Sequence, residues 1–176
     1  SQSAFVPGRQ ILDNVLVAHE SIHFLNNKRT GKDGYMAIKL DMSKAYDRVE
    51  WVFLVKIMQK MGFYPKWIQK ILECITSVTY SINVNGEKRG FIKPSRDLRQ
   101  GDPLSPYLFL VCAEGFSALL RKANRQGSMS GINIAKEATS LSHLFFADDS
   151  LIFCIPKAEK AVQLMRVLED YERASG

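Results

Sequence analysis

The sequence has no long hydrophobic stretch: its longest uninterrupted apolar run extends only from Tyr107 to Ala113. A membrane-spanning helix needs about 18–20 apolar residues, so the sequence excludes a transmembrane anchor. The N-terminal residues do not combine a charged lead with an apolar stretch, which disfavours a secretory signal. We therefore expect an intracellular protein of the nucleus or cytoplasm and, because the chain starts without Met, a piece of a longer one.

Cysteine is also scarce. Cys74, Cys112 and Cys154 are odd in number and far apart, and each lies among apolar neighbours. This pattern disfavours both a disulfide framework and a zinc knuckle. We expect three buried thiols in a reducing compartment.

Apolar and basic residues, by contrast, are plentiful. Apolar residues make up 46% of the 176 residues, which suffices for the buried core of one compact domain. Lysine and arginine number 24 against 18 acidic residues, which gives a net charge of +6 and a pI of about 9.3. This balance favours a polyanionic partner, although many basic proteins bind none.

Apolar spacing and turn residues predict alternating helices and strands. The dipeptide Asn85-Gly86 is the strongest short signal, because it suits a tight hairpin turn. The expected helices cover 10–26, 47–61, 65–77, a stretch from just beyond Pro106 to 125, and 157–172, and the expected strands cover 35–41, 79–83, 91–92, 141–146 and 151–155. This order suits an α+β fold in which helices back an antiparallel sheet.

Three aspartates stand at the ends of expected strands. Asp148 and Asp149 lie in the turn 147–150 between two apolar strands, and Asp41 ends the strand 35–41. Adjacent carboxylates repel each other, and a divalent cation would relieve this repulsion. If the three acids meet, their oxygens suit Mg²⁺ and phosphoryl or nucleotidyl transfer. The alternative is that they are ordinary turn and surface residues.

A second segment with potential chemistry, RQGDPLSP at 99–106, enters the longest expected helix. Gly101 would let the backbone approach a ligand closely, and Gln100 could hydrogen-bond a base or ribose edge. Tyr46, shortly after the strand that carries Asp41, could lie against a sugar or fill the core. An ordinary proline-rich helix cap would explain the same segment.

Four segments together resemble the motifs of reverse transcriptases. DMSKAYDRVEW, RQGDPLSPYLF and FFADDSLIF match three palm motifs in order and approximate spacing, and AFVPGRQILDN resembles the fingers motif that precedes them. The resemblance covers essentially the whole chain and is to LINE-type (non-long-terminal-repeat) retrotransposon enzymes, particularly plant ones, with group II intron proteins more distant. It implies one reverse transcriptase domain fragment, with partial fingers at about 1–34 and a polymerase palm at about 35–176. Such a palm has a ferredoxin-like or RRM-like core, and the thumb is not part of this fragment.

The resemblance also implies a reaction. An RNA-directed DNA polymerase extends a DNA primer on an RNA template with deoxynucleoside triphosphates, and the remainder of the polyprotein would supply a thumb and an endonuclease. Two Mg²⁺ ions, which Mn²⁺ can replace, would activate the primer hydroxyl and stabilise the departing pyrophosphate. A catalytically dead nucleic-acid-binding remnant of such an element is the alternative.

Residue by residue, the resemblance assigns metal binding and catalysis to the acids. Asp41, Asp148 and Asp149 would hold the ions, and the backbone carbonyl of Met42 is a candidate further ligand.

Nucleotide and nucleic-acid contacts fall to other motif residues. Tyr46 would be the steric gate that excludes a 2′-hydroxyl, and Gln100 and Gly101 would form the lip of the nucleotide pocket. Arg9 would contact the template or primer backbone. Phe146 stands near the primer terminus, where the wider superfamily usually has Tyr.

A competing motif, HESIH at 19–23, fits the H-E-x-x-H pattern of zinc metalloproteases. Asn26 and Arg29 stand where the extended pattern needs Gly and His, and the third-ligand Glu expected about twenty residues later is missing. We therefore expect these His and Glu side chains to face outward from a helix.

Two basic segments suit phosphates, although each could be plain solvated surface. One comprises Lys28, Arg29 and Lys32, and the other comprises Lys88, Arg89, Lys93, Arg96 and Arg99. Tyr80 and Phe91 could stack on bases, but we expect both in the core of the sheet.

Overall fold

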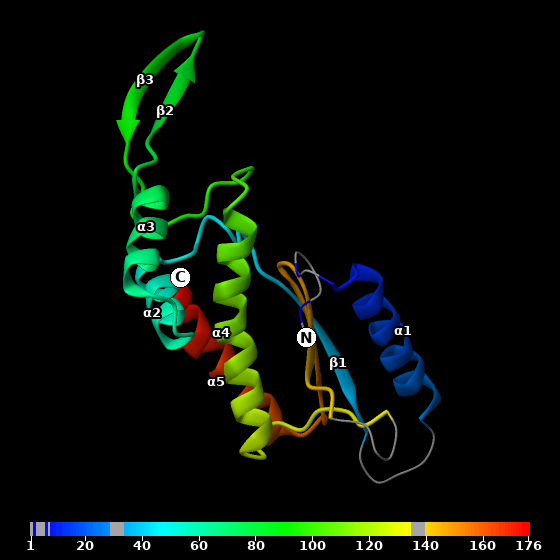
Figure 1. Ribbon diagram of the computed structural model, residues 1–176. Helices are drawn as coiled ribbons and strands as arrows, with labels where there is room; N and C mark the ends of the chain where they lie inside the picture. The colour runs from blue at the N-terminus through cyan, green and yellow to red at the C-terminus, as the bar shows by residue number, and fades with distance from the viewer. Residues whose placement is uncertain (1, 3–5, 7, 29–33, 135–139) are drawn as a thin grey trace. The chain divides into compact units, whose positions relative to one another are not determined.

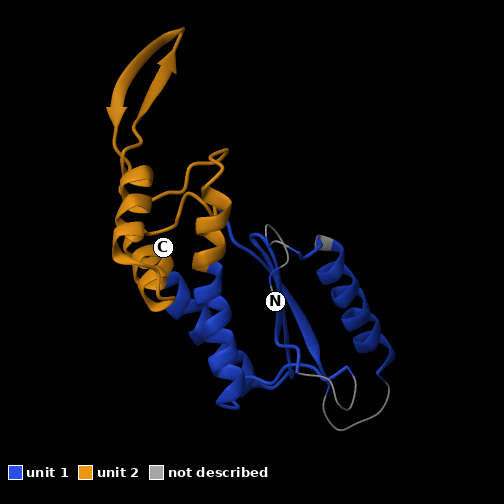
Figure 2. Cartoon of the chain, viewed as in Figure 1, with its two compact units in different colours: residues 1–43, 113–173 blue, residues 44–112, 174–176 orange. Residues whose placement is uncertain are grey.

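The computed structural model of the protein describes residues 2, 6, 8–28, 34–134 and 140–176. The chain divides into two compact units (Figure 2): unit 1 comprises residues 1–43 and 113–173, and unit 2 comprises residues 44–112 and 174–176. Within the described ranges, no helix is long and apolar enough to cross a membrane.

Unit 1 is built on a three-stranded antiparallel sheet. Strands β1 (Met36–Asp41), β5 (Asp149–Cys154) and β4 (His143–Phe146) lie in the order β1-β5-β4. Helix α1 (Ile11–Asn27) covers one face of this sheet, and parts of α4 (Ser105–Arg125) and α5 (Ala158–Ser175) cover the other (Figure 1). The prediction of an α+β fold with an antiparallel sheet backed by helices is therefore confirmed.

Alternation along the strands decides which side chains enter each core. Met36, Ile38 and Leu40 of β1 pack on the face covered by α4 and α5. The buried residues of this cluster are Ala113, Phe116, Leu120, Ala123, Met129, Phe145, Ile152, Cys154 and Leu164. The Phe116 ring stacks on Phe145, with ring centroids 5.4 Å apart and planes 6° apart. Burial of this apolar surface is the main force that holds the sheet against α4 and α5.

The other face of the sheet packs on α1 through a smaller cluster of Ile132, Leu144 and Phe153. Ala18 and Leu25 of α1 contribute to it, and buried Asn14 donates a hydrogen bond from Nδ2 to the Phe145 carbonyl at 3.0 Å. The helix predicted at 10–26 is confirmed. Several other large apolar side chains of α1, however, are exposed to solvent instead of packing on the sheet, namely Leu12, Val15, Leu16, Val17 and Ile22.

Unit 2 contains α2 (Trp51–Lys60), α3 (Pro65–Thr76), the hairpin of β2 (Tyr80–Val84) and β3 (Glu87–Ile92), and the first part of α4. Gly62, with φ +82°, follows α2, and Pro65 opens α3, as the stop and start signals predict. Asn85 and Gly86 form the predicted hairpin turn with φ of +49° and +88°.

Three predicted boundaries are wrong. Strand β3 begins at Glu87 instead of at residue 91. The helix predicted from 47 begins at Trp51, because the backbone of Tyr46 and Val49 instead bonds to a later segment: Leu98 donates to the Tyr46 carbonyl and Asp97 to that of Val49. The four-residue turn predicted at 147–150 is a two-residue turn, because Phe146 pairs directly with Asp149.

The cysteine prediction is correct for two of three residues. Cys112 and Cys154 are buried, and burial raises the pKa of the Cys112 thiol to about 12. Cys74 is exposed on α3. Its position within an apolar stretch of sequence was misleading: the buried side chains of α3 are Ile68 and Ile71.

Candidate active site

Asp41 and Asp149 lie directly opposite each other at the end of the β1–β5 ladder. Asp149 also pairs with Phe146 on its other side, so the three residues form one row across the sheet. Side chains of directly opposed residues have Cβ atoms about 4.5–5.5 Å apart and lie on the same face. The register thus brings two of the predicted acids together. We call Asp41, Asp149 and Phe146 the acid row.

Asp148 lies beside this row, in the tight turn of the hairpin. Ala147 and Asp148 are the only residues between β4 and β5, and Ala147 has a φ of +54°. This conformation costs an L-residue about 1–2 kcal/mol. The exposed Asp148 side chain is therefore held next to Asp149 by a turn with a strained first residue.

Lys39 supplies a positive charge to the acid row. It precedes Asp41 by two residues and therefore shares its face of β1, and its Nζ lies 2.8 Å from Asp149 Oδ1. The hydrogen bond and charge of Asp149, followed by the charges of Asp41 and Asp148, raise the pKa of Lys39 above its usual value. All three acids thus contribute to the negative potential at the Lys39 ammonium group.

The donor set fits a divalent cation. Mg²⁺ keeps several waters and takes one or two protein carboxylates, with substrate phosphates completing its shell. Asp41 and Asp149 supply such a pair. Among the residues that the structure describes, no three His, Cys, Asp or Glu side chains are grouped to hold a metal ion, so a ligand role for Asp148 stays a prediction. Met42 is half-buried against the core under α4 and α5, and its role also stays a prediction.

A second group of predicted residues is assembled within unit 2. The bond from Leu98 to the Tyr46 carbonyl is 2.9 Å long, and Gln100 Nε2 donates to Asp47 Oδ1 at 3.2 Å. The Tyr46 ring stacks on Phe109 of α4, with centroids 4.9 Å and planes 18° apart. Tyr46 and Gln100 are therefore held on two segments that are hydrogen-bonded to each other. Their roles toward a nucleotide stay predictions.

Asp97 anchors this arrangement. Its backbone has a φ of +120°, which L-residues rarely adopt. Trp51 Nε1 donates to its carbonyl at 2.7 Å, and the Tyr80 hydroxyl donates to its carboxylate at 2.8 Å. Burial first, and then this hydrogen bond, raise the pKa of Tyr80. These contacts hold a strained residue just before the RQGDPLSP segment.

Position 101 also requires glycine. Its φ of +86° lies in the left-handed region, and a Cβ placed there would have no described atom within 4 Å. The glycine is therefore explained by backbone conformation and not by crowding. After it, Asp102 Oδ1 accepts a hydrogen bond from the Leu104 amide at 2.8 Å, next to the start of α4.

The remaining predicted residues lie elsewhere in unit 1. Arg9 is exposed and donates from Nη1 to the Gln2 carbonyl at 2.8 Å. Phe146 is half-buried against the cluster on the α1 side of the sheet. Residues 4, 5 and 7 of the fingers-like motif, and Arg29 and Lys32 of the first basic segment, lie outside the described residues.

The side chains of the H-E-x-x-H motif, His19, Glu20 and His23, are exposed on α1, as expected. The Asn27 amide nitrogen lies 2.9 Å from His23 Nε2. In the described residues around this helix, nothing is grouped with them as a metal site.

Comparison with known proteins identifies the family. The sequence profile described as "Reverse transcriptase (RNA-dependent DNA polymerase)" matches residues 1–176. The chain belongs to the reverse transcriptase family. Enzymes of this family in general work with divalent metal ions, which agrees with the acid row.

Several relatives of this reverse transcriptase chain come from mobile elements. It is 30% identical over 171 residues to the Transposon TX1 uncharacterized 149 kDa protein of Xenopus laevis, covering 97% of the chain and 12% of that protein. It is 28% identical over 130 residues to the Pol polyprotein of the type-1 retrotransposable element R2 of Popillia japonica, covering 74% and 20%. The resemblance to non-LTR retrotransposon enzymes is thereby confirmed.

A plant relative and two solved structures extend this picture. The uncharacterized mitochondrial protein AtMg01250 of Arabidopsis thaliana is 51% identical over 67 residues, covering 38% of the chain and 55% of that protein. Apo telomerase of Candida tropicalis, truncated from the C-terminal domain, has a TM-score of 0.61 at 15% identity, covering 92% of this chain and 32% of the telomerase. Telomerase of Candida albicans, solved with a fragment of telomeric RNA, has a TM-score of 0.56 at 16% identity, covering 94% and 28%. These likenesses support the polymerase palm fold.

The chain spans only 12% to 55% of the length of these curated relatives.

Two residues of this reverse transcriptase chain were missed from sequence, Lys39 and Asp97. The first could have been found from strand alternation, because Lys39 and Asp41 share a face of β1. No sequence signal pointed to Asp97, whose importance comes from contacts with Trp51 and Tyr80 far along the chain.

Proposed function

We propose that this chain supplies the catalytic palm of an RNA-directed DNA polymerase from a non-LTR retrotransposon. Its substrates would be a DNA primer on an RNA template and deoxynucleoside triphosphates, with Mg²⁺ as cofactor and Mn²⁺ as a substitute. The observation that carries this proposal is the direct pairing of Asp41 with Asp149 across β1 and β5, in a chain that matches the reverse transcriptase family along its whole length. Such an enzyme would work in the nucleus or cytoplasm, together with the thumb and endonuclease of a longer polyprotein.

The carboxylates would act as ligands and as the source of negative potential. Divalent ions, when bound, supply activation of the primer 3′-hydroxyl and stabilisation of the departing pyrophosphate. Asp41 and Asp149 would hold the ions from opposite strands, and Asp148 would add charge from the turn. Lys39 would have to leave Asp149 Oδ1 as the ion binds, because both cations need the same oxygen.

The nucleotide contacts would come from the segments bonded together in unit 2. Tyr46 would lie under the sugar and exclude a 2′-hydroxyl, supported from behind by the Phe109 ring. Gln100 would contact the nucleotide edge, and the left-handed backbone at Gly101 would turn the segment so that no side chain obstructs it. Arg9 would contact the nucleic-acid backbone, as its exposure allows, and Phe146 would lie near the primer terminus.

A nucleic-acid-binding remnant without catalysis is the second candidate. The observation that favours it is the lack, in the described residues, of any group of three side chains arranged to hold a metal ion. The remnant would keep the basic surface and the palm fold but would not extend a primer.

Primer extension tests the proposal. Oligo(dT) annealed to poly(A) RNA is incubated with the protein, labelled nucleotide and Mg²⁺ or Mn²⁺. We expect extension that Asp149→Asn abolishes and that Asp170→Asn, at an exposed aspartate on α5, leaves intact. Template binding without extension would support the remnant, and extension that survives Asp149→Asn would refute the assigned site.

A further inference from the structure

The hairpin of β2 and β3 is the most exposed part of unit 2. It extends beyond the end of α3 (Figure 1), and every residue of β3 is exposed. Its tip is well defined, because the Gly86 amide donates to Asn83 Oδ1 at 2.9 Å. An isolated two-stranded hairpin is at best marginally stable in water. An exposed two-stranded hairpin of this kind is therefore a candidate binding surface.

Phe91 is the clearest sign that the hairpin is a contact surface. Its side chain is 75% exposed, the highest value among the large apolar side chains that the structure describes. The expectation that Phe91 belongs to the core of the sheet is therefore wrong, because within the described part of the chain β2 and β3 pair only with each other. A single exposed ring is common on protein surfaces, so what Phe91 can bind depends on the side chains that share its face of the hairpin.

A bulge in β3 decides which way Phe91 faces. Ile82 pairs with Arg89 and Tyr80 pairs with Ile92, so two residues of β3, Gly90 and Phe91, stand opposite a single residue of β2. Gly90 adopts a φ of +75°, as the first residue of such a bulge does. Without the extra residue, the Phe91 side chain would lie on the same face of the hairpin as Arg89.

The bulge instead places Phe91 on the face of Lys88, Asn83 and Ser81. We call these four residues the hairpin face. It combines an exposed aromatic ring, an ammonium group, an amide and a hydroxyl, and it contains no acidic residue.

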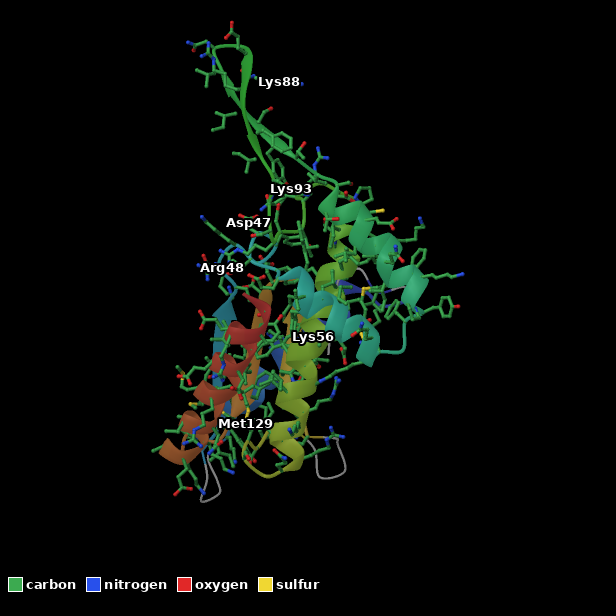
Figure 3. All side chains as sticks on the ribbon, turned by 90° about the vertical axis from the view of Figure 1, so that its left-hand side faces the viewer. Asp47, Arg48, Lys56, Lys88, Lys93 and Met129 are labelled. Carbon is green, nitrogen blue, oxygen red and sulfur yellow. The ribbon has the colours of Figure 1, made fainter. Side chains whose placement is uncertain are left out.

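The charges around this face are mostly uncompensated. Glu87 is paired with Arg89 at 2.7 Å, on the opposite face of the hairpin. Lys88 near the tip and Lys93 at the base (Figure 3) have no acidic partner among the described residues. A basic and aromatic surface is complementary to nucleic acid, in which negative phosphates alternate with stacking bases.

We propose that the hairpin face, together with Lys93 at the base of the hairpin, binds single-stranded nucleic acid, with Phe91 stacked on a base and Lys88 and Lys93 in contact with the flanking phosphates. The choice of nucleic acid as partner rests on the proposed function, whereas the binding itself needs no catalysis. Stacking is tolerant of sequence because every base has a π face. The hairpin face therefore binds a strand without selecting its base sequence.

Fluorescence anisotropy with a labelled twenty-nucleotide strand tests this inference on the full chain. Phe91→Ala should weaken binding roughly 5- to 150-fold, the loss typical of one stacked base, and Phe91→Trp should retain it. The matched control is Tyr64→Ala, because Tyr64 is an aromatic residue with 67% exposure elsewhere in unit 2. RNA and DNA strands of the same sequence show which of the two the hairpin prefers.

Salt dependence tests the lysines separately. Lys88→Gln should reduce the slope of log affinity against log salt by about 0.7, the share of one phosphate contact on a single strand. Lys56→Gln, at an exposed lysine of α2 (Figure 3), should leave the slope unchanged. Melting curves confirm that the variants remain folded.

The inference is overturned if Phe91→Ala binds both strands as tightly as Tyr64→Ala does, and the exposed ring would then belong to a protein contact. The proposed polymerase function fails by a different result. If the protein binds strands through Phe91 but never extends a primer, the binding role of the hairpin stands and the polymerase function is refuted.

Discussion

In the proposed metal site, Lys39 and a divalent cation would compete for Asp149. The Lys39 ammonium lies 2.8 Å from Asp149 Oδ1, and replacing it in Lys39→Met leaves Asp41, Asp148 and Asp149 without this compensating charge. One unit charge about 6 Å from a dication in water changes binding roughly tenfold. Screening at physiological salt reduces this to about threefold. We expect Lys39→Met to bind Mn²⁺ about tenfold more tightly at low salt and about threefold more tightly at physiological salt.

The electron paramagnetic resonance signal of free Mn²⁺ measures this affinity directly. Lys39→Arg is the matched control, because it preserves the charge and should keep the affinity of the parent chain. Asp149→Asn should weaken binding, since it removes the negative charge that holds Lys39 and would hold the ion. Equal Mn²⁺ affinities for Lys39→Met and Lys39→Arg would refute the competition.

Three further predictions concern other parts of the molecule. Burial lowers the pKa of His143 to about 4, from a usual 6.5, so between these pH values the unfolded chain takes up a proton that the folded chain does not. The free energy of unfolding should therefore fall by about 3 kcal/mol from pH 6.5 to 4. Urea titrations in which the His143→Asn variant shows the same fall would contradict this. Ala147→Gly should stabilise the chain by about 0.5–1 kcal/mol, because glycine adopts the positive φ of the turn without the Cβ penalty, and a lower urea midpoint would speak against it. Tyr46→Ala should raise ribonucleotide incorporation in primer extension, because the ring no longer excludes the 2′-oxygen, whereas unchanged sugar discrimination would remove Tyr46 from the gate.

Local signals predicted much of the fold. The apolar strand ending at Asp41 and the apolar strands around Asp148 are short segments whose burial and turn residues are readable in the sequence. The Asn85-Gly86 turn has the same origin, because its positive φ values suit only a few residue types. Four motifs in order then indicate the family.

Contacts between distant segments could not be predicted in this way. The start of α2 at Trp51 depends on hydrogen bonds from Asp97 and Leu98 to the preceding loop. Phe91 looked like a core residue because aromatic residues usually are, but no third strand joins β3 in the described sheets. The partner of Asp41 across the sheet depends on register, and a shift of one residue would have turned the side chain to the other face.

Iron-mediated cleavage tests the metal site most directly. Fe²⁺ replaces Mg²⁺ in the protein, and ascorbate with peroxide then generates hydroxyl radicals that cut the backbone near the bound ion. We expect cuts near Asp41 and near Asp148 and Asp149, suppressed by excess Mg²⁺ and lost in Asp149→Asn. Cuts near His19 and His23 instead, or a pattern that Asp149→Asn leaves unchanged, would contradict a metal site at the acid row.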